Sequence, residues 1–398
     1  MEGDGGLPPG AAERVRKADV ILGERRHFNR WKSPRPPSLE IRGGRTLIPT
    51  LRSYPHRYQV VVLDDGDPLD HGIGEVLVKQ YPSDRLSVIP ARSYVQLALS
   101  SLRIPRSVAR VLSLRDRPIE LIRHALVRQP EALVVLTDHH NSPGRILTYC
   151  KDLGSSEYVF NLLERPGAET ERHHTARDAN DLPSNPDPLN LVVLTHRRER
   201  PRPDVPRPGI PNAELTAATD SMITPHHQRM MNLGHLQLRG EETVWDIGAA
   251  TGSVSIEAAR IHPDASFHAV EKREDRLATL RSNVKSFRTY NVIPHHGEAP
   301  EILSSLPDPD RVFLGGSGGR AREIVDVVVD RLNPGGLILA NFITFENANQ
   351  TRDRLLEYGF TVDERLVTVH RQGTLNNGLR LWEDAGVLHQ LIAVPRIR

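Results

Sequence analysis

A carboxylate and two glycines in this chain have the types and spacing to hold a charged cofactor. Asp246, Gly248 and Gly252 lie in the segment VWDIGAATGSVSIEAA. This segment predicts a short buried strand, a glycine turn and the first turns of a helix. The dinucleotide fingerprint G-x-G-x-x-G would need glycine at Ala250 and at Ser253, so a pyrophosphate site is disfavoured. A carboxylate at the end of the strand repels phosphate and attracts a cation, which favours a cationic cofactor.

The spacing D-x-G-x-x-T-G resembles motif I of methyltransferases that use S-adenosylmethionine (SAM), a cofactor with a sulfonium and an ammonium group. The resemblance implies that SAM is the cofactor and that its amino-acid end lies close to the backbone of the turn. The contacts it implies are Asp246, Gly248, Thr251, Gly252 and Ser253. The alternative is an ordinary glycine turn between a strand and a helix.

An acidic residue follows the next predicted strand. Glu271 ends the strand 266–270 and stands about 20 residues beyond the glycine turn. A carboxylate in that place can accept hydrogen bonds from both ribose hydroxyls, as in many nucleotide-binding α/β sheets. The alternative is a carboxylate that only caps the following helix. Together with Asp246, the position favours ribose contact.

Two further segments follow predicted strands of the same sheet. The turn GEAP flanks the adenine in SAM-binding sheets, so Glu298 and Ala299 are candidates for cofactor contact. The glycine-rich run GGSGG leaves its backbone free to approach a ligand, with Gly315 expected on the cofactor side and Ser317 on the substrate side. A flexible loop is the alternative for GGSGG.

The segment NFITFEN ends the last of these strands, where substrate should arrive. Its substrate-side candidates are Asn341, Thr344 and Glu346, and none of them can be assigned as an acid. Methyl transfer to an electron-rich carbon needs alignment more than acid or base catalysis. The catalytic residues are therefore left open.

The elements that position these residues alternate regularly. Five strands alternating with helices, followed by a hairpin, are the layout expected of a class I methyltransferase sheet, which is Rossmann-like. The strands are expected at 244–247, 266–270, 291–296, 311–314 and 336–342, the hairpin strands at 361–371 and 387–395 with a turn through Asn376-Asn377-Gly378, and helices at 225–238, 253–259, 273–287 and 348–358.

The first half of the chain alternates in the same way, which predicts an α/β layer with a mostly parallel sheet. The chain is expected to begin with a helix. Strands are expected at 19–23, 60–63, 86–90, 109–114, 132–137, 157–163 and 189–195, and helices at 11–18, 72–79, 93–102, 119–128 and 142–153.

Five pieces of the first half resemble successive landmarks of the tetrapyrrole methylase family, namely ADVILGERRH, DGDPLDHGIG, SVIPARSYVQLAL, SLRDRP and LTDHHNSPGRI. The resemblance implies that the turn formed by Gly66, Asp67 and Pro68 lies against SAM, in a cleft between two α/β subdomains. Glycine allows close backbone approach and proline fixes the turn. For these three residues alone, a turn that merely ends a strand is the alternative.

The first half also departs from that family. The family starts with an apolar strand and a G-x-G-x-G turn, whereas this chain has only GDGG at 3–6 before its first helix, so that strand is expected to be missing or lost from the gene model. Asp65 replaces a small residue, His71 an aromatic residue, and Arg115-Asp116 a His-Gly pair. These replacements bear on catalysis by this half more than on its fold.

A proline-rich linker is predicted at 198–212. The run HRRERPRPDVPRP contains four prolines, which remove backbone donors and disfavour a helix. It separates a predicted tetrapyrrole methylase domain at 1–197 from a predicted class I methyltransferase domain at 213–398. Its arginines are expected to be a solvated face and not a nucleic-acid arm.

The second half resembles the decarboxylating precorrin methyltransferases that act at C15, through DIGAATGSVSIEAA, VEKRED, HGEAPEIL, PDPDRVFLGGSGG and NFITFEN. GGSGG is the most discriminating element, because nucleic-acid amino-methyltransferases often have an Asn/Asp-Pro-Pro-aromatic motif there. Ala250 stands where the family has glycine. The whole chain is similar to the fused two-domain precorrin-6Y methyltransferases. This implies methylation at C5 by the first domain and at C15 by the second, with loss of the C12 acetate carboxylate as carbon dioxide, in cobalamin biosynthesis.

Composition narrows the class of protein. The 398 residues have a formal net charge of +2, so no basic field points to nucleic acid. Cys150 is the only cysteine, which excludes an intrachain disulfide and fits a reducing cytoplasm. No apolar run approaches the ~18 residues of a membrane span. We expect a cytoplasmic homo-oligomer with a small-molecule tetrapyrrole substrate and no nucleic-acid or membrane partner.

No metal site is expected. The chain has histidine pairs at 139–140, 173–174, 226–227 and 295–296. His295 and His296 are neighbours on a predicted strand and point to opposite faces, so a metal held by that pair is disfavoured. The same argument disfavours a metal at the other three pairs, each of which is expected at the surface.

Two other functions stay open. One is an RNA or small-molecule methyltransferase on the same sheet, which the balanced charge and GGSGG disfavour. The other is a binding or scaffold protein whose altered first-half motifs no longer catalyse.

Overall fold

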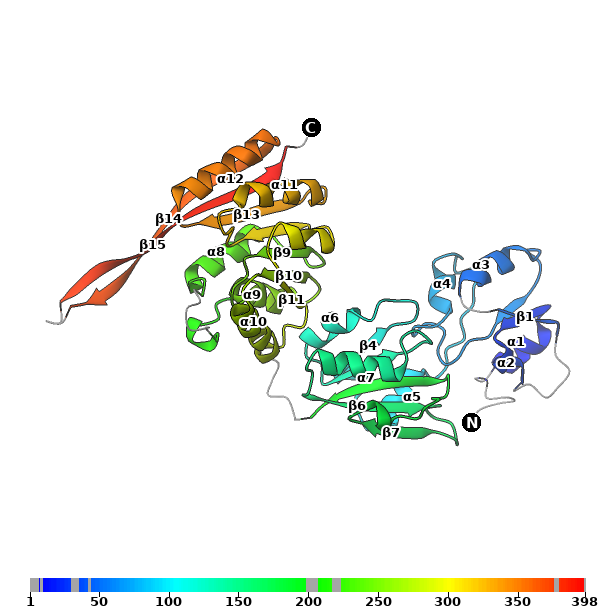
Figure 1. Ribbon diagram of the computed structural model, residues 1–398. Coiled ribbons are helices and arrows are strands. Elements are labelled where there is room, and N and C mark those ends of the chain that lie inside the picture. The colour runs from blue at the N-terminus through cyan, green and yellow to red at the C-terminus, as the bar shows by residue number, and fades with distance from the viewer. Residues whose placement is uncertain are drawn as a thin grey trace. The chain divides into compact units, whose positions relative to one another are not determined.

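The computed structural model describes residues 7, 10–29, 36–41, 44–197, 207–216, 223–375 and 379–396 (Figure 1). The chain divides into two compact units. The first comprises Met1–Arg117, Glu131–Leu147 and Tyr158–His196, and the second comprises Pro118–Pro130, Thr148–Glu157 and Arg197–Arg398. The GDGG run at 3–6, residues 198–206 of the predicted linker and the hairpin turn at 376–378 lie outside the described residues. No helix in the described part is long and apolar enough to cross a membrane.

The first unit contains a small sheet in the order β2-β1-β3. Here β1 (Val20–Gly23) lies between β2 (Ser38–Glu40) and β3 (Val60–Val62), and both neighbours run parallel to it. The surrounding helices are α1 (Ala11–Lys17), α2 (Arg25–Asn29), α3 (Gly44–Arg52) and α4 (Gly74–Val78). The predictions of β1, β3, α1 and α4 are confirmed. The elements β2, α2 and α3 were missed, because a stretch rich in charge and proline gives no periodic apolar signal.

A second sheet of the first unit has the order β4-β5-β8-β6-β7. Its strands are β4 (Ala109–Ser113), β5 (Ala132–Leu136), β6 (Tyr158–Glu164), β7 (Arg172–Ala176) and β8 (Asn190–His196). Only the pair β4 and β5 is parallel, and the other three pairs are antiparallel, so the prediction of a mostly parallel sheet is wrong here. The short connection between β6 and β7 favours their antiparallel pairing, and β8 lies between β5 and β6 and runs antiparallel to both.

Two other expectations for the first unit need correction. β7 was missed because RHHTA is polar and four of its five residues are at least partly exposed at the edge of the sheet. The predicted strand 86–90 is wrong, because these residues belong to no strand and pair with none among the described residues. The three remaining helices of this half lie where they were predicted, and they are α5 (Tyr94–Ser101), α6 (Leu121–Val127) and α7 (Pro143–Asp152).

The second unit contains a sheet in the order β11-β10-β9-β12-β13-β15-β14. Its strands are β9 (Thr243–Ile247), β10 (Ser266–Glu271), β11 (Val292–His296), β12 (Arg311–Leu314), β13 (Leu337–Phe342), β14 (Phe360–Thr374) and β15 (Arg380–Pro395). The first five are parallel and β15 is antiparallel to β13. The predicted class I methyltransferase layout is confirmed.

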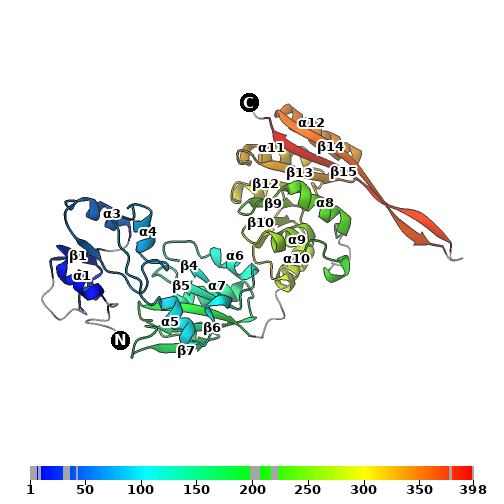
Figure 2. The ribbon, with the colours of Figure 1, turned by 180° about the vertical axis from the view of Figure 1, so that it is seen from behind.

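Helices cover both faces of this sheet (Figure 2). They are α8 (His226–Leu236), α9 (Ser253–Ile261), α10 (Glu274–Phe287), α11 (Ala321–Arg331) and α12 (Phe345–Glu357). Trp245 and Ile247 of β9 pack in one core cluster with residues of α11 and α12, whereas Val244 packs with residues of α9 and α10. This division follows from the alternation of side chains along a strand. The hairpin of β14 and β15 is longer than predicted, and its distal part extends beyond the sheet in both views.

Candidate functional site

The glycine turn after β9 is tied to the end of the neighbouring parallel strand β10. The backbone N–H groups of Gly248 and Ala249 donate to the carbonyl of Val270 at 3.0 and 2.9 Å. The N–H of Ala250 donates to Oε2 of Glu271 at 2.9 Å. Because the carboxyl ends of parallel strands meet at one edge, residues predicted from two separate motifs come together here.

Asp246 is a buried carboxylate with one unpaired oxygen. Its side chain lies on β9, and the residue is only 2% exposed. Its Oδ2 accepts from the hydroxyl of Ser255 at 2.5 Å, whereas Oδ1 has no hydrogen-bond partner among the described residues. Burial raises the pKa of Asp246 to about 6, and the nearby charge of Glu271 contributes to the rise. A buried acceptor without a donor is costly, so the site suits a ligand that brings positive charge or a donor.

Glu271 connects the turn to the start of α10. It is 5% exposed, and its Oε1 accepts from the backbone N–H of Arg273, the N-cap residue of α10, at 2.9 Å. The helix-capping alternative is therefore realised in part. Each carboxylate oxygen has a second lone pair, so the same group retains capacity for ribose hydroxyls. Ribose contact stays a prediction.

The run GGSGG lies directly against the turn. The N–H groups of Gly315 and Gly316 donate to the carbonyl of Ile247 at 3.0 and 3.3 Å. A β-carbon on Gly248 would lie 2.6 Å from the carbonyl oxygen of Gly316. Glycine at 248 is thus required by contact between the two loops, whatever ligand they hold. Ser317 is half-buried within the run.

The other predicted cofactor residues of this unit differ in their surroundings. Thr251 is 1% exposed and its Oγ1 has no hydrogen-bond partner among the described residues. Gly252 has φ +76° before α9, and Ser253 is the buried first residue of that helix. Glu298 is exposed and forms an ion pair with Lys272, Nζ to Oε1 3.0 Å. Ala299 is buried in the core cluster of β9, β12 and β13.

Of the substrate-side candidates, only Asn341 is buried. Its Nδ2 donates to Oδ1 of Asn232 on α8 at 2.9 Å, and its Oδ1 accepts from Nε2 of Gln390 on β15 at 3.1 Å. Thr344 and Glu346 are exposed at the start of α12. Asn232 and Gln390 were not predicted, because neither lies in a recognisable motif.

A buried ion pair holds the segment that enters the second unit. Nε of Arg229 on α8 lies 2.7 Å from Oε2 of Glu257 on α9, and their side chains are 0% and 1% exposed. Arg229 also donates to the carbonyls of Ile210 and Thr224. The ion pair and these hydrogen bonds hold the backbone at Ile210 and Thr224 against α8 and α9. The sequence analysis did not predict this ion pair.

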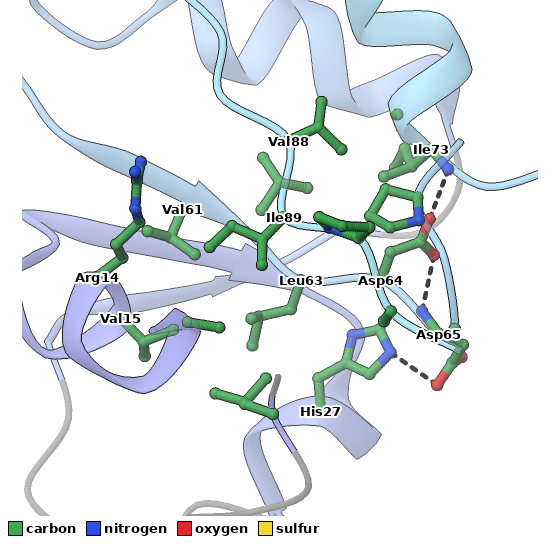
Figure 3. Close-up of a pocket in the computed structure, with 18 of the residues that line it drawn as sticks. Arg14, Val15, His27, Val61, Leu63, Asp64, Asp65, Ile73, Val88 and Ile89 are labelled. Atoms are coloured by element: carbon green, nitrogen blue, oxygen red, sulfur yellow. Dashed lines mark hydrogen bonds and ion pairs between the residues drawn. The ribbon is translucent and has the colours of Figure 1, made fainter. Parts of the chain in front are cut away.

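A large pocket lies in the first unit, between the small sheet and the segment that leads into α5 (Figure 3). Its volume is about 1430 Å³, larger than the ~300–1,000 Å³ of a typical small-molecule site. Gly66 and Pro68 line it, together with residues 86–90. Asp67 is absent from its lining, and its Oδ1 accepts from the N–H of Leu69 at 2.8 Å. Of the three residues predicted for this turn, two therefore reach the pocket.

A histidine and two aspartates stand in the wall of this pocket. Nε2 of His27 lies 3.1 Å from Oδ1 of Asp65, and the side chains are 8% and 9% exposed. Asp64 accepts from the backbone N–H groups of Asp65 and Ile73 at 2.9 and 2.6 Å. Burial raises the pKa of Asp64 above its usual range. The sequence marked Asp65 only as a departure from the family; its pairing with His27 needed the fold.

Among the described residues, no group of three or more histidine, cysteine, aspartate or glutamate side chains is placed to hold a metal. His295 and His296 do lie in different surroundings. His295 stacks on His268 of the neighbouring strand, with 3.0 Å between Nε2 and Nδ1, whereas half-exposed His296 pairs with Glu274. Burial lowers the pKa of His268 to about 4, so this pair is neutral at neutral pH.

A family model and several known proteins match the chain. The model described as a precorrin methyltransferase domain matches residues 216–390. A precorrin-6Y C(5,15)-methyltransferase (decarboxylating) from Sinorhizobium sp is 29% identical over 396 residues, which cover 96% of this chain and 92% of that protein. A probable cobalt-precorrin-6B C(15)-methyltransferase (decarboxylating) from Pyrobaculum calidifontis is 34% identical over 166 residues, which cover 41% of this chain and 85% of that protein. Among solved structures, a precorrin-6Y C5,15-methyltransferase from Geobacter metallireducens is 34% identical, with a TM-score of 0.45, over 47% of this chain and 96% of that one.

Proposed function

The chain belongs to the precorrin methyltransferase family, and we propose that it methylates precorrin-6Y at C5 and C15 and releases the C12 acetate carboxylate as carbon dioxide, in cobalamin biosynthesis. The observation that carries this proposal is the similarity to a decarboxylating precorrin-6Y C(5,15)-methyltransferase across 96% of the chain. The relatives reported above do not favour an RNA methyltransferase or a scaffold protein.

We assign the C15 methylation and the decarboxylation to the second unit and the C5 methylation to the first. The match to the precorrin methyltransferase domain at 216–390 supports the assignment of C15 methylation and decarboxylation to the second unit. The pocket beside Gly66 and Pro68 supports the assignment of C5 methylation to the first unit, because its volume of about 1430 Å³ leaves room for a cofactor and a macrocycle. The predicted division into 1–197, 198–212 and 213–398 is kept as part of this proposal.

SAM is the proposed cofactor, and when bound it supplies an electrophilic methyl group on its sulfonium sulfur. The residues of the second unit fit this group. The unpaired Oδ1 of buried Asp246 offers a negative charge without a partner, and the lone pairs of Glu271 remain available to hydroxyls. The full set proposed to hold SAM is Asp246, Gly248, Thr251, Gly252, Ser253, Glu271, Glu298, Ala299 and Gly315 in the second unit, and Gly66, Asp67 and Pro68 in the first.

The protein's own part in methyl transfer is mainly positioning. Displacement at a methyl carbon gains most from alignment of the two reacting atoms, so rigid loops matter more than an acid or a base. The contact between Gly248 and Gly316 and the hydrogen bonds to Ile247 provide that rigidity at the end of β9. We propose Ser317, Asn341, Thr344 and Glu346 as groups on the substrate side.

The function is tested by incubating the full chain with precorrin-6Y and SAM and measuring the mass of the product by mass spectrometry. We expect two added methyl groups and the loss of carbon dioxide. One methyl group with that loss would limit the activity to the second unit. Unchanged substrate, in the presence of SAM binding, would refute precorrin-6Y as the substrate.

Cofactor binding is tested separately by calorimetric titration with SAM. We expect Asp246→Ala to abolish the site of the second unit and to leave the site of the first. Asp330→Ala is the control, because Asp330 is exposed on α11 and remote from the turn in sequence. Absence of SAM binding by the unmodified chain would contradict the proposed use of this cofactor.

Two expectations from the sequence are kept as proposals, a homo-oligomeric state and a cytoplasmic location. The hairpin of β14 and β15 supports the proposed homo-oligomeric state, because it exposes apolar side chains, namely Leu366, Leu375, Leu379 and Trp382. Light scattering after size-exclusion chromatography measures the mass, and we expect Trp382→Ser together with Leu366→Ser to lower it. A monomeric unmodified chain would contradict this proposal.

A further inference from the structure

His27 and Asp65 meet because they follow two neighbouring parallel strands. β1 ends at Gly23 and leads to His27, whereas β3 ends at Val62 and leads to Asp65. The two strands pair in parallel, and the N–H of Leu63 continues the ladder by donating to the carbonyl of Leu22 at 2.8 Å. Both side chains therefore stand at the carboxyl edge of the small sheet, and both line the pocket (Figure 3).

A hydrogen bond from the backbone to Nδ1 of His27 indicates its tautomer. The backbone N–H of Glu24 donates to Nδ1 of His27 at 3.1 Å, so Nδ1 is the acceptor nitrogen of the ring. The ring proton then lies on Nε2, which is 3.1 Å from Oδ1 of Asp65. A doubly protonated ring would place an N–H against the N–H of Glu24. With Nδ1 engaged by the N–H of Glu24, Nε2 faces Asp65 in a buried contact between the two side chains.

The neighbouring residues Asp64 and Asp65 have different structural roles. Both oxygens of Asp64 accept backbone N–H groups, one from Asp65 and one from Ile73, so this carboxylate organises the loop. A β-carbon on Gly66, with φ +72°, would lie 3.3 Å from the backbone nitrogen of Tyr94, which fixes the loop against α5. The carboxylate of Asp65 contacts a side chain, the ring of His27. It stands in a wall that also contains Gly66 and Pro68.

Methylation of a bridging carbon releases a proton. A new carbon–carbon bond forms from the ring to the methyl group, and the carbon–sulfur bond breaks with its electron pair going to sulfur. The methylated carbon then bears both the methyl group and its original hydrogen. Loss of that hydrogen as a proton returns the electron pair of the carbon–hydrogen bond to the conjugated ring system. A carboxylate in the wall of the pocket can accept this proton.

We propose that Asp65 is the proton acceptor for C5 methylation in the first unit and that His27 is the positioning residue that holds its carboxylate. This inference rests on the proposed function of that unit. The contact with the ring of His27 limits the orientations of the carboxylate, and a carboxylate in the wall of the pocket can accept a proton from a bound substrate. The substitution of a small residue by Asp65 is then a gain of a catalytic group.

Asp65→Asn tests the assignment, because it keeps the size of the side chain and its acceptor oxygen but lowers its basicity. We expect the product of this variant to lack the C5 methyl group while it still contains the C15 methyl group and has lost carbon dioxide. Calorimetry should give unchanged SAM affinity at the first unit. Asp84→Asn is the matched control, since Asp84 is exposed and does not line the pocket, and it should give the doubly methylated product.

A substrate with deuterium at C5 separates proton removal from positioning. We expect the residual C5 methylation of Asp65→Asn to slow further with deuterium, because proton loss has become rate-limiting, whereas the unmodified chain shows a smaller effect. His27→Ala should lower kcat for C5 methylation without a matching change in KM. His27→Gln should restore part of the lost rate, since its side-chain amide can take the place of the ring beside Asp65.

The outcomes distinguish this inference from the proposed function. An unmodified chain that adds both methyl groups, with Asp65→Asn equally active at C5 and with the same isotope effect, would overturn the role of Asp65 and leave the function intact. An unmodified chain that adds only the C15 methyl group would overturn the function of the first unit and this inference with it.

Discussion

The backbone N–H of Ala250 donates to Oε2 of Glu271 at 2.9 Å, from a residue whose φ is +50°. The left-handed conformation places this N–H toward the neighbouring strand. Such a conformation costs a non-glycine residue about 1–2 kcal/mol. The hydrogen bond to a buried carboxylate offsets part of that cost, which explains how alanine is accommodated where the family has glycine.

Ala250→Gly should therefore raise the free energy of unfolding. Relief of the backbone strain exceeds the added entropy of glycine in the unfolded chain, and we expect a net gain of about 0.5–1 kcal/mol in urea denaturation. Gly252→Ala is the opposite case, since it would place a β-carbon 2.9 Å from Cγ of Leu280 at φ +76°. A loss of stability in Ala250→Gly would show that the methyl group of Ala250 has a packing role that outweighs its strain.

The carboxyl group of Asp246 should make the stability of the ligand-free protein depend on pH. Burial raises its pKa to about 6 in the folded state, against an ordinary value of 3.8. The folded state binds this proton more tightly, so the associated stability is fully present below about pH 4 and is lost as the pH rises through about 6. The difference amounts to about 3 kcal/mol. Asp246→Asn should abolish this pH dependence, as measured by thermal unfolding from pH 4.5 to 8 without SAM. Equal slopes for both proteins would contradict the raised pKa.

The ion pair of Arg229 and Glu257 should be a strong determinant of stability. Removing one partner leaves the other charge buried and unpaired, so Arg229→Ala should lower the free energy of unfolding by about 3–5 kcal/mol. The exposed pair of Arg322 and Glu357 is the control. Arg322→Ala should change the free energy of unfolding by less than about 0.5 kcal/mol. Similar effects of the two substitutions would mean that the buried pair contributes no more than a surface contact.

The contact between Gly248 and Gly316 should be needed for C15 methylation. Gly248→Ala would place a β-carbon 2.6 Å from the carbonyl of Gly316, which forces the two loops apart. We expect a loss of rate of about tenfold or more at C15, because small displacements of positioning loops are costly. Gly335→Ala is a matched control, since Gly335 has the same φ of +77° but no atom within 4 Å of the added carbon. Gly335→Ala introduces the same backbone strain but no steric clash with another loop. An equal loss of C15 methylation rate in both variants would therefore attribute the effect to backbone strain.

Much of the second unit could be predicted, because its strands are short apolar runs separated by amphipathic helices. The five parallel strands and the places of Asp246, Gly248 and Glu271 at their carboxyl ends follow from that alternation. The first unit was harder. Its small strand β2 and the edge strand β7 are exposed, so they lack the apolar signal that marks a buried strand.

The amino-acid sequence by itself determined the family, the class I sheet and the motif residues at strand ends, because these depend on local patterns of apolar residues and glycine. Only the tertiary structure decided which of those residues meet. Ala250 reaches Glu271, Gly248 touches Gly316, and His27 pairs with Asp65, each across two strands that are neighbours in the sheet and distant in the chain. Strand order and register fix such contacts, and neither is encoded in the spacing of a single motif.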